Sequence, residues 1–295
     1  MKRAAVILGI VILGIGITTV AVWAQAQTSP AQQNPPAAGQ TAPAPGATAP
    51  AAKRPPQAKT QPEFDAWKLA SANTDGPGLE KAADDFATKF PDSELRILLY
   101  KNTMRLYQNA NNAEKTETMG RKVLSFDADD PEALVIVAEV IAERTHDSDI
   151  DKDQRYAEAV TMAQKATQTV DTDVQVPAST PQERIDAYKS LLRSNAYSIM
   201  GTIDFKKENY AAAQENLQKS IDAFPSNPDP VVILRLALAL DKQQKYPDAL
   251  KVANRAVELT QDNTVIGTPA RRERDRLQQL TGGAAPAQPQ SPPKN

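Results

Sequence analysis

Prolines divide this chain into short segments and so restrict it to one kind of architecture. Between residues 63 and 281 proline occurs ten times, and the intervening segments are rich in Ala, Leu, Lys, Glu and Gln. Because proline cannot continue a helix from within, it is confined to a helix's first turn or to the links between helices. Within the segments apolar residues recur with the 3.6-residue period of an α-helix. The pattern predicts an all-α body made of many short helices.

The two flanks of this body have a different composition. Nine of the 23 prolines lie between Pro30 and Pro62, and four lie between Pro286 and Pro293. The few apolar residues among them are mostly alanines, so neither flank can bury a core. We therefore expect a disordered linker over residues 27–62, a folded domain over 63–281 and a disordered tail over 282–295.

The N-terminus has the features of an export segment. Lys2 and Arg3 precede an apolar run from Ala4 to Ala24. A short cationic start followed by an apolar stretch is typical of a signal peptide, and small residues allow cleavage before Gln25. A run of about 20 apolar residues can also stay in a bilayer. Residues 1–26 are thus predicted to be a signal peptide or a membrane anchor. Either alternative places the body outside the cytoplasm, in the periplasm or cell envelope.

Composition excludes several classes of function. The chain has no cysteine and one histidine, which rules out disulfides, thiol nucleophiles, zinc–cysteine clusters and a multi-histidine metal site within one chain. A formal net charge of -2 and 5% aromatic residues provide neither a basic field nor a stacking platform for nucleic acid. Glycine-rich phosphate loops are absent as well. We expect no cofactor and no catalysis.

One segment shows regular spacing of large and small residues. Gly201 and Ala213 are small where two consecutive helices would cross, which lets the helices approach closely. Tyr197 and Tyr210 would fill the space on either side, and Pro225 would end the second helix. The full set of regularly spaced residues is Tyr197, Met200, Gly201, Tyr210, Ala213, Leu217, Ser220 and Pro225.

This spacing resembles the tetratricopeptide repeat (TPR), a helix-turn-helix unit of about 34 residues. The next unit, with Tyr246 and Ala249, matches nearly as well, while the units upstream match less closely. The resemblance covers nearly all of residues 64–261. It implies a right-handed solenoid of about five helical hairpins, closed by a solvating cap helix over residues 269–281.

The resemblance also implies a binding surface. In TPR arrays the first helices of successive units line a concave groove that holds a peptide of a protein partner. The residues carried over to that groove are Lys101, Arg105, Asn109, Ser198, Thr202 and Phe205. The first three lie four apart on one helix face and could hold a carboxylate. Salt bridges to neighbouring glutamates are the alternative.

One loop has the spacing of a metal site. Asp147, Asp149, Asp151 and Glu158 occupy the ligand positions of a calcium loop, but Lys152 stands where that loop needs glycine. The alternative is a solvated acidic loop in which Asp151 or Asp153 caps a helix that already contains Glu158. His146, beside this loop, is expected to be exposed to solvent.

These features together predict an exported TPR scaffold that mediates protein–protein interaction without catalysis. Two alternatives remain from the sequence. One is an assembly factor of the cell envelope held by an uncleaved N-terminal anchor over residues 4–24. The other is a calcium-responsive adaptor that uses the loop at residues 147–158.

Overall fold

The computed structural model describes residues 53–177 and 179–282. Within these ranges the chain forms eleven α-helices and no strand, so the all-α prediction is confirmed. The predicted signal or anchor segment, most of the linker and the tail after Gly282 lie outside the described residues. The helices are α1 (Gln61–Ser71), α2 (Gly76–Lys89), α3 (Arg96–Asn109), α4 (Ala113–Phe126), α5 (Pro131–Arg144), α6 (Lys152–Thr169), α7 (Gln182–Lys206), α8 (Tyr210–Ala223), α9 (Pro230–Lys242), α10 (Tyr246–Glu258) and α11 (Gly267–Leu280).

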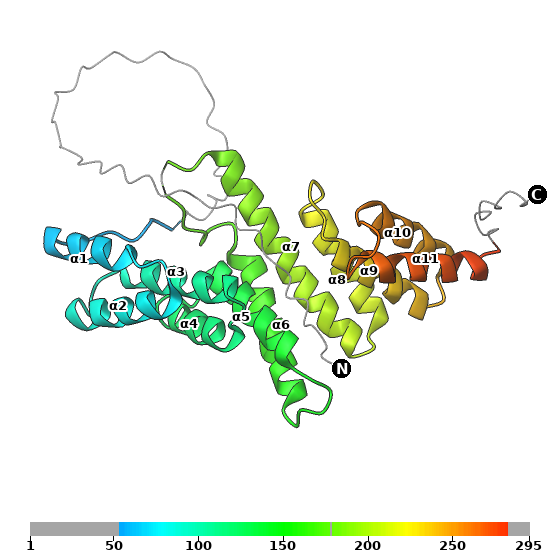
Figure 1. Ribbon diagram of the computed structural model, residues 1–295, viewed down its shortest axis with the longest axis horizontal. Helices are drawn as coiled ribbons and strands as arrows, with labels where there is room; N and C mark the ends of the chain where they lie inside the picture. Colours follow the sequence, from blue (N-terminus) through cyan, green and yellow to red (C-terminus); the bar gives the residue numbers. More distant parts are fainter. Residues whose placement is uncertain (1–52, 178, 283–295) are drawn as a thin grey trace, which may run out of the picture. The chain divides into compact units, whose positions relative to one another are not determined.

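Each helix packs against the next helix in the chain, as Figure 1 shows. The pairs α1/α2, α3/α4, α5/α6, α7/α8 and α9/α10 are hairpins, and α11 packs against α10. First helices of successive hairpins also touch, since α5 contacts α7 and α7 contacts α9. Packing of this kind, between neighbours in sequence, is that of the predicted helical solenoid.

Proline stands in the first turn of several helices, as the sequence predicted, and short polar residues cap others. Pro131 and Pro230 stand in the first turns of α5 and α9, and Pro247 stands in that of α10. The residue before several helices accepts a hydrogen bond from a backbone N–H of the first turn, which supplies an acceptor that the helix itself lacks. These capping residues are Thr60, Asp75, Asn112, Asp130 and Asp229.

The same turn joins the two helices of three hairpins. Its middle residue is left-handed, with φ of 55° at Asn111, 61° at Glu208 and 60° at Gln244. In each turn the next residue donates its N–H to the carbonyl five residues earlier, at 2.9, 2.9 and 3.0 Å respectively. This hydrogen bond satisfies a terminal carbonyl of the first helix. The recurrence shows that these hairpins are copies of one structural unit.

The crossing of α7 and α8 is as tight as the small residues predicted. Ala213 is fully buried, and Gly201 lies against Leu217. A Cβ atom at Gly201 would lie 2.7 Å from Cγ of Leu217, so a larger residue does not fit there without a shift. Tyr210 is half-buried at this crossing, with its ring 5.5 Å from that of Phe205. Ala249 is fully buried and Tyr246 half-buried in the next hairpin.

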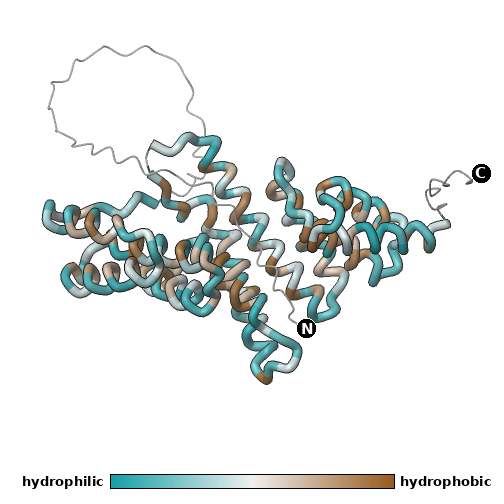
Figure 2. The backbone as a smooth tube through the Cα atoms, in the orientation of Figure 1, coloured by the Kyte–Doolittle hydropathy of each residue, from teal (hydrophilic) through white to brown (hydrophobic). Residues whose placement is uncertain are grey.

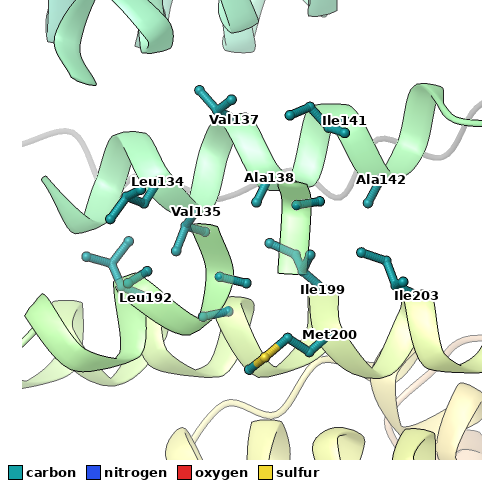
Figure 3. Packing of buried hydrophobic residues seen from close by; sticks show 14 of the residues in the cluster. Leu134, Val135, Val137, Ala138, Ile141, Ala142, Leu192, Ile199, Met200 and Ile203 are labelled. Carbon is teal, nitrogen blue, oxygen red and sulfur yellow. The ribbon is translucent and has the colours of Figure 1, made fainter. Parts of the chain in front are cut away.

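Apolar residues form three clusters along the array, which share helices at their borders. The first spans α1 to α5, the second α5 to α7, and the third α7 to α11. Figure 2 shows apolar positions concentrated on α5 and α9. Figure 3 shows Ala138 and Ala142 of α5 opposite Ile199 and Ile203 of α7, a small-to-large fit. The core is therefore a continuous strip rather than one central cluster.

The structure differs from the predicted boundaries at two places. Residues 53–59 are not a free spacer, because Lys53 donates its N–H to the carbonyl of Thr172 at 2.9 Å and pairs with Asp127 at 2.6 Å. Arg54 likewise pairs with Glu94 at 2.6 Å. Cations in this short stretch thus reach carboxylates of the array, and α1 begins at Gln61. In addition, α7 is 25 residues long, so it starts well before the segment that matches the repeat.

Candidate functional site

The first helices of the hairpins bring most of the charged residues of interest together. We call the side of the array formed by α3, α5, α7 and α9 the first-helix face. Polar side chains lie along this face from one helix to the next. Some of their charges are paired with an opposite charge, and others are not. These side chains are Lys101, Arg105, Asp130, Glu132, Glu139, Glu143, Asn195, Thr202, Lys206, Asp229 and Arg235.

Charges between α3 and α5 are fully paired. Lys101 is 6% exposed, and its Nζ lies 2.7 Å from Asp130 and 3.1 Å from Glu132. Arg105 binds both oxygens of Glu132 through Nε at 2.5 Å and a terminal nitrogen at 2.6 Å. Burial opposes the charge on Glu132, but Arg105 and Lys101 outweigh it and lower the pKa of that carboxyl. This network locks two adjacent hairpins together.

The predicted groove residues of α3 are therefore not a free cationic patch. Lys101 and Arg105 do hold carboxylates, but those of Asp130 and Glu132 in the next hairpin, which is the salt-bridge alternative raised by the sequence. Asn109 lies apart from them, exposed at the end of α3.

The predicted groove residues of α7 have three different environments. Ser198 is buried, and its carbonyl accepts a hydrogen bond from the Thr202 hydroxyl at 2.7 Å. Thr202 also accepts from the guanidinium of Arg235 in α9 at 2.8 Å. Phe205 packs against Tyr210 and the α7–α11 cluster. Only Thr202 connects two first helices through its side chain.

Acidic groups between α5 and α9 lack such pairing. Glu139 of α5 is half-buried, and its carboxylate takes part in no hydrogen bond or ion pair within the described residues. Burial, together with the charges of Glu143 and Asp229, raises the pKa of Glu139 to about 8. Glu143 is exposed as a residue, but partial desolvation of its carboxyl raises the pKa, although Lys206 and Arg235 oppose this. Burial raises the pKa of Asp229 as well, against the backbone N–H of Val231 and the charge of Arg235.

Two cations lie beside these acids without forming an ion pair with them. Arg235 has Thr202 as the hydrogen-bond acceptor of its guanidinium, and burial lowers its pKa despite Asp229 and Glu143. Lys206 donates from Nζ to the carbonyl of Ala142 at 2.6 Å. Burial and the nearby Arg235 lower the pKa of Lys206.

Two fully buried polar atoms in the same region also lack a partner in the described structure. These are Nδ2 of Asn195 in α7 and Oδ2 of Asp229. A buried polar group without a hydrogen bond costs about 1–3 kcal/mol, so such atoms are uncommon in folded proteins. We call Glu139, Glu143, Asn195, Thr202, Lys206, Asp229 and Arg235 the central polar cluster. Perturbed charged groups of this kind are typical of binding sites.

The acidic loop after α5 does not gather its carboxylates. Glu158 lies inside α6, as predicted, where it accepts from Arg121 at 2.7 Å. Asp149 accepts the backbone N–H of His146 at 2.8 Å, while the Asp147 side chain is 90% exposed. Asp151 stands at the N-cap of α6 but makes no side-chain cap bond, so the predicted capping is wrong. No metal-ligating group of three such side chains occurs in the described part of the chain.

Two shallow pockets occur among the described residues, and the second borders the central polar cluster at Lys206. One, of about 350 Å³, lies where residues 53–56 meet α3 and the end of α4. The other, of about 450 Å³, lies between the acidic loop and the end of α7, with Lys206 in its wall. Both are lined mainly by charged side chains that already pair with residues of this chain, including Arg54 with Glu94 and Lys53 with Asp127.

The sequence contained a signal for Arg235 and Asp229 that the repeat pattern did not use. Arg235 is the one cation in the otherwise apolar stretch 230–240, and Asp229 precedes a proline that opens a helix. A charge inside an apolar helix points to a specific partner or a binding role.

Comparisons with known proteins give no family. No family model matches the chain, and no curated protein matches it. A solved structure to which it is similar is described as "Assembly Chaperone of RpL4 (Acl4) (Residues 1-338)", with 13% identity and a TM-score of 0.35. The match covers 75% of this chain and 99% of that one. No helix in residues 53–177 or 179–282 combines the length and apolar character that a membrane span needs.

Proposed function

We propose that this protein is a non-catalytic scaffold of the TPR type that holds a protein partner against its first-helix face. The repeated turn at Asn111, Glu208 and Gln244 supports the repeat assignment, as does the tight crossing at Gly201. Stacked hairpins provide an extended preformed surface, so the scaffold loses little conformational entropy on binding.

The observation that carries the proposal is the contrast within the first-helix face. Between α3 and α5 the buried charges are fully paired, so that part of the face is structural. Between α5 and α9 the carboxylate of Glu139 and the buried atoms of Asn195 and Asp229 have no partner among the described residues. A bound polypeptide would supply the missing hydrogen bonds and opposite charges.

Site-specific photo-crosslinking in cells tests this assignment. A photoreactive amino acid is placed at Asn109 or Glu143, both exposed on first helices, or at Lys251, exposed on the second helix α10. We expect a discrete crosslinked protein from the first two positions and none from the third. Equal crosslinking from all three positions, or none from any, would contradict the proposal.

We propose further that the scaffold works outside the cytoplasm. The support is the cationic start followed by the apolar run from Ala4 to Ala24. Mass spectrometry of the mature N-terminus separates a secreted protein from a membrane-anchored assembly factor. A start near Gln25 or Gln27 supports release, an intact Met1 in the membrane fraction supports the anchor, and an intact N-terminus in the cytoplasm contradicts export.

A further inference from the structure

We propose that the central polar cluster binds a cationic side chain, arginine or lysine, of the partner polypeptide. The proposal rests on the proposed function, because it assigns chemistry to the same face. It goes further by naming the group that is recognised and the residues that recognise it, with Glu139 and Asp229 as the principal acceptors.

The two acceptors belong to helices that both contact α7. Glu139 belongs to α5 and Asp229 caps the start of α9, while α7 contacts both helices. The two carboxylates are close enough for the charge of Asp229 to affect Glu139. Oδ1 of Asp229 accepts the N–H of Val231 at 2.8 Å, but its buried Oδ2 has no partner in the described structure. Each acid therefore has acceptor capacity left over.

The face of α7 that carries Thr202 offers a hydrogen-bond donor. Asn195, Ser198 and Thr202 are spaced by three and four residues, so they share one face of the helix. Ser198 is small and buried on this face. Nδ2 of Asn195 is buried without an acceptor. A main-chain carbonyl of the bound segment would satisfy it.

Charge balance favours a cation over an anion. Once Glu139 is ionised, the cluster has three acids, namely Glu139, Glu143 and Asp229, against the two cations Lys206 and Arg235. Both cations already donate within the chain, Lys206 to the carbonyl of Ala142 and Arg235 to Thr202. An anion placed at Arg235 would be repelled by Asp229 and Glu143. A guanidinium between Glu139 and Asp229 would instead offset the repulsion between these two carboxylates.

A metal ion is a less suitable occupant. No group of three or more acidic or histidine side chains in the described residues is arranged to hold one. An arginine side chain needs only two separated acceptors and presents its donors in a planar fork, so it matches carboxylates that come from different helices.

Proton linkage gives the binding a distinct signature. Burial and the neighbouring acids raise the pKa of Glu139 to about 8, so below that pH the carboxyl is mainly protonated. A bound cation favours the ionised form and lowers this pKa. The charges that act on Glu139 are those of Glu143 on its own helix and Asp229 at the start of α9, while Lys206 of α7 and Arg235 of α9 act on the neighbouring Glu143. Binding therefore strengthens as the pH rises toward 8, with release of a proton.

The test is an NMR titration of the full-length protein labelled with ¹³C at glutamate side-chain carboxyls. The probes are N-acetyl-argininamide and its neutral isostere N-acetyl-citrullinamide, and Glu139→Gln identifies the resonance of Glu139. We expect the arginine probe to lower the pKa of Glu139 and the citrulline probe to leave it unchanged. At pH 8, Glu139→Gln should weaken binding of the arginine probe at least tenfold, whereas the matched variant of exposed Glu258, Glu258→Gln, should not.

The outcomes separate this inference from the scaffold function. If Asn109 and Glu143 crosslink a partner but the pKa of Glu139 responds equally to both probes or to neither, cation recognition is wrong and the scaffold remains. If the arginine probe lowers the pKa of Glu139 but no position crosslinks a protein, the cluster binds cations and the scaffold proposal is wrong. A normal pKa for Glu139 in the free protein, with no effect of Glu139→Gln on probe binding, would also overturn the inference.

Discussion

Replacing Gly201 by alanine tests the tight crossing of α7 and α8 directly. The new Cβ would lie 2.7 Å from Cγ and 3.0 Å from both Cδ2 and the backbone N of Leu217. Carbon atoms in good contact lie about 3.5–4.0 Å apart, so the overlap approaches roughly 1 Å. Overpacking of this kind costs about 1–3 kcal/mol, whereas replacing a helical glycine by alanine gains about 1 kcal/mol.

The expected net effect of Gly201→Ala is a loss of up to about 2 kcal/mol in the free energy of unfolding, toward the upper end of that range because Cγ and a backbone atom cannot turn aside as a side-chain tip can. Leu217→Ala alone should cost about 2–5 kcal/mol, since Leu217 is fully buried. In that background the clash with the leucine side chain is gone, and only the 3.0 Å approach to the backbone N of residue 217 remains. Gly201→Ala should then be neutral or stabilising by up to about 1 kcal/mol.

Urea denaturation followed by far-UV circular dichroism measures all four members of this cycle. Ala211→Gly, at an exposed position of α8, calibrates the glycine–alanine difference and should cost about 1 kcal/mol. If Gly201→Ala stabilises the wild-type protein, or costs the same in both backgrounds, the close approach of α7 and α8 is wrong.

Three further outcomes follow from the charges and the packing. Lys101→Met should lower the free energy of unfolding in urea by about 3–5 kcal/mol, because Asp130 and Glu132 lose a buried counterion. The control Lys81→Met, at a side chain 78% exposed, should change this free energy by less than about 0.5 kcal/mol. The native pKa of Glu139 is raised to about 8, so the native state binds more protons than the unfolded state, and stability should fall as the pH rises from the normal glutamate pKa through 8. In thermal melting across this pH range, Glu139→Gln should not show this loss of stability. A pH profile identical to that of the wild-type protein would disprove the raised pKa of Glu139. Ala213→Asp should cost roughly 3 kcal/mol or more by burying a charge at the crossing, while Ala211→Asp retains wild-type helicity on melting.

The hairpins were predictable because their determinants are local. Pro225 and Pro247 mark helix ends and starts directly, and the small residues Gly201 and Ala213 recur at fixed spacing where helices cross. Local chemistry of this kind acts within one hairpin. It can therefore be recognised in the sequence even when the rest of the fold is not known.

The candidate site was less predictable because its contacts are not local. The sequence placed Lys101 and Arg105 on one face correctly, but whether their carboxylate would come from a partner or from Glu132 depended on how two hairpins stack. The effect of the Asp229 charge on Glu139 joins α5 to the start of α9, two helices that are far apart in the sequence and both contact α7. The first turns of α7 were also missed, since they precede the segment with repeat spacing.

The left-handed turn shared by three hairpins has an evolutionary consequence. The turn needs only one left-handed residue and one hydrogen bond, and both lie inside the hairpin. The turns that follow α3, α7 and α9 could therefore replace one another. A gene could gain or lose a whole hairpin by in-frame duplication or deletion, and the turn between its two helices would keep its structure. Related chains are then expected to vary in length by whole multiples of one hairpin, rather than by scattered insertions within helices.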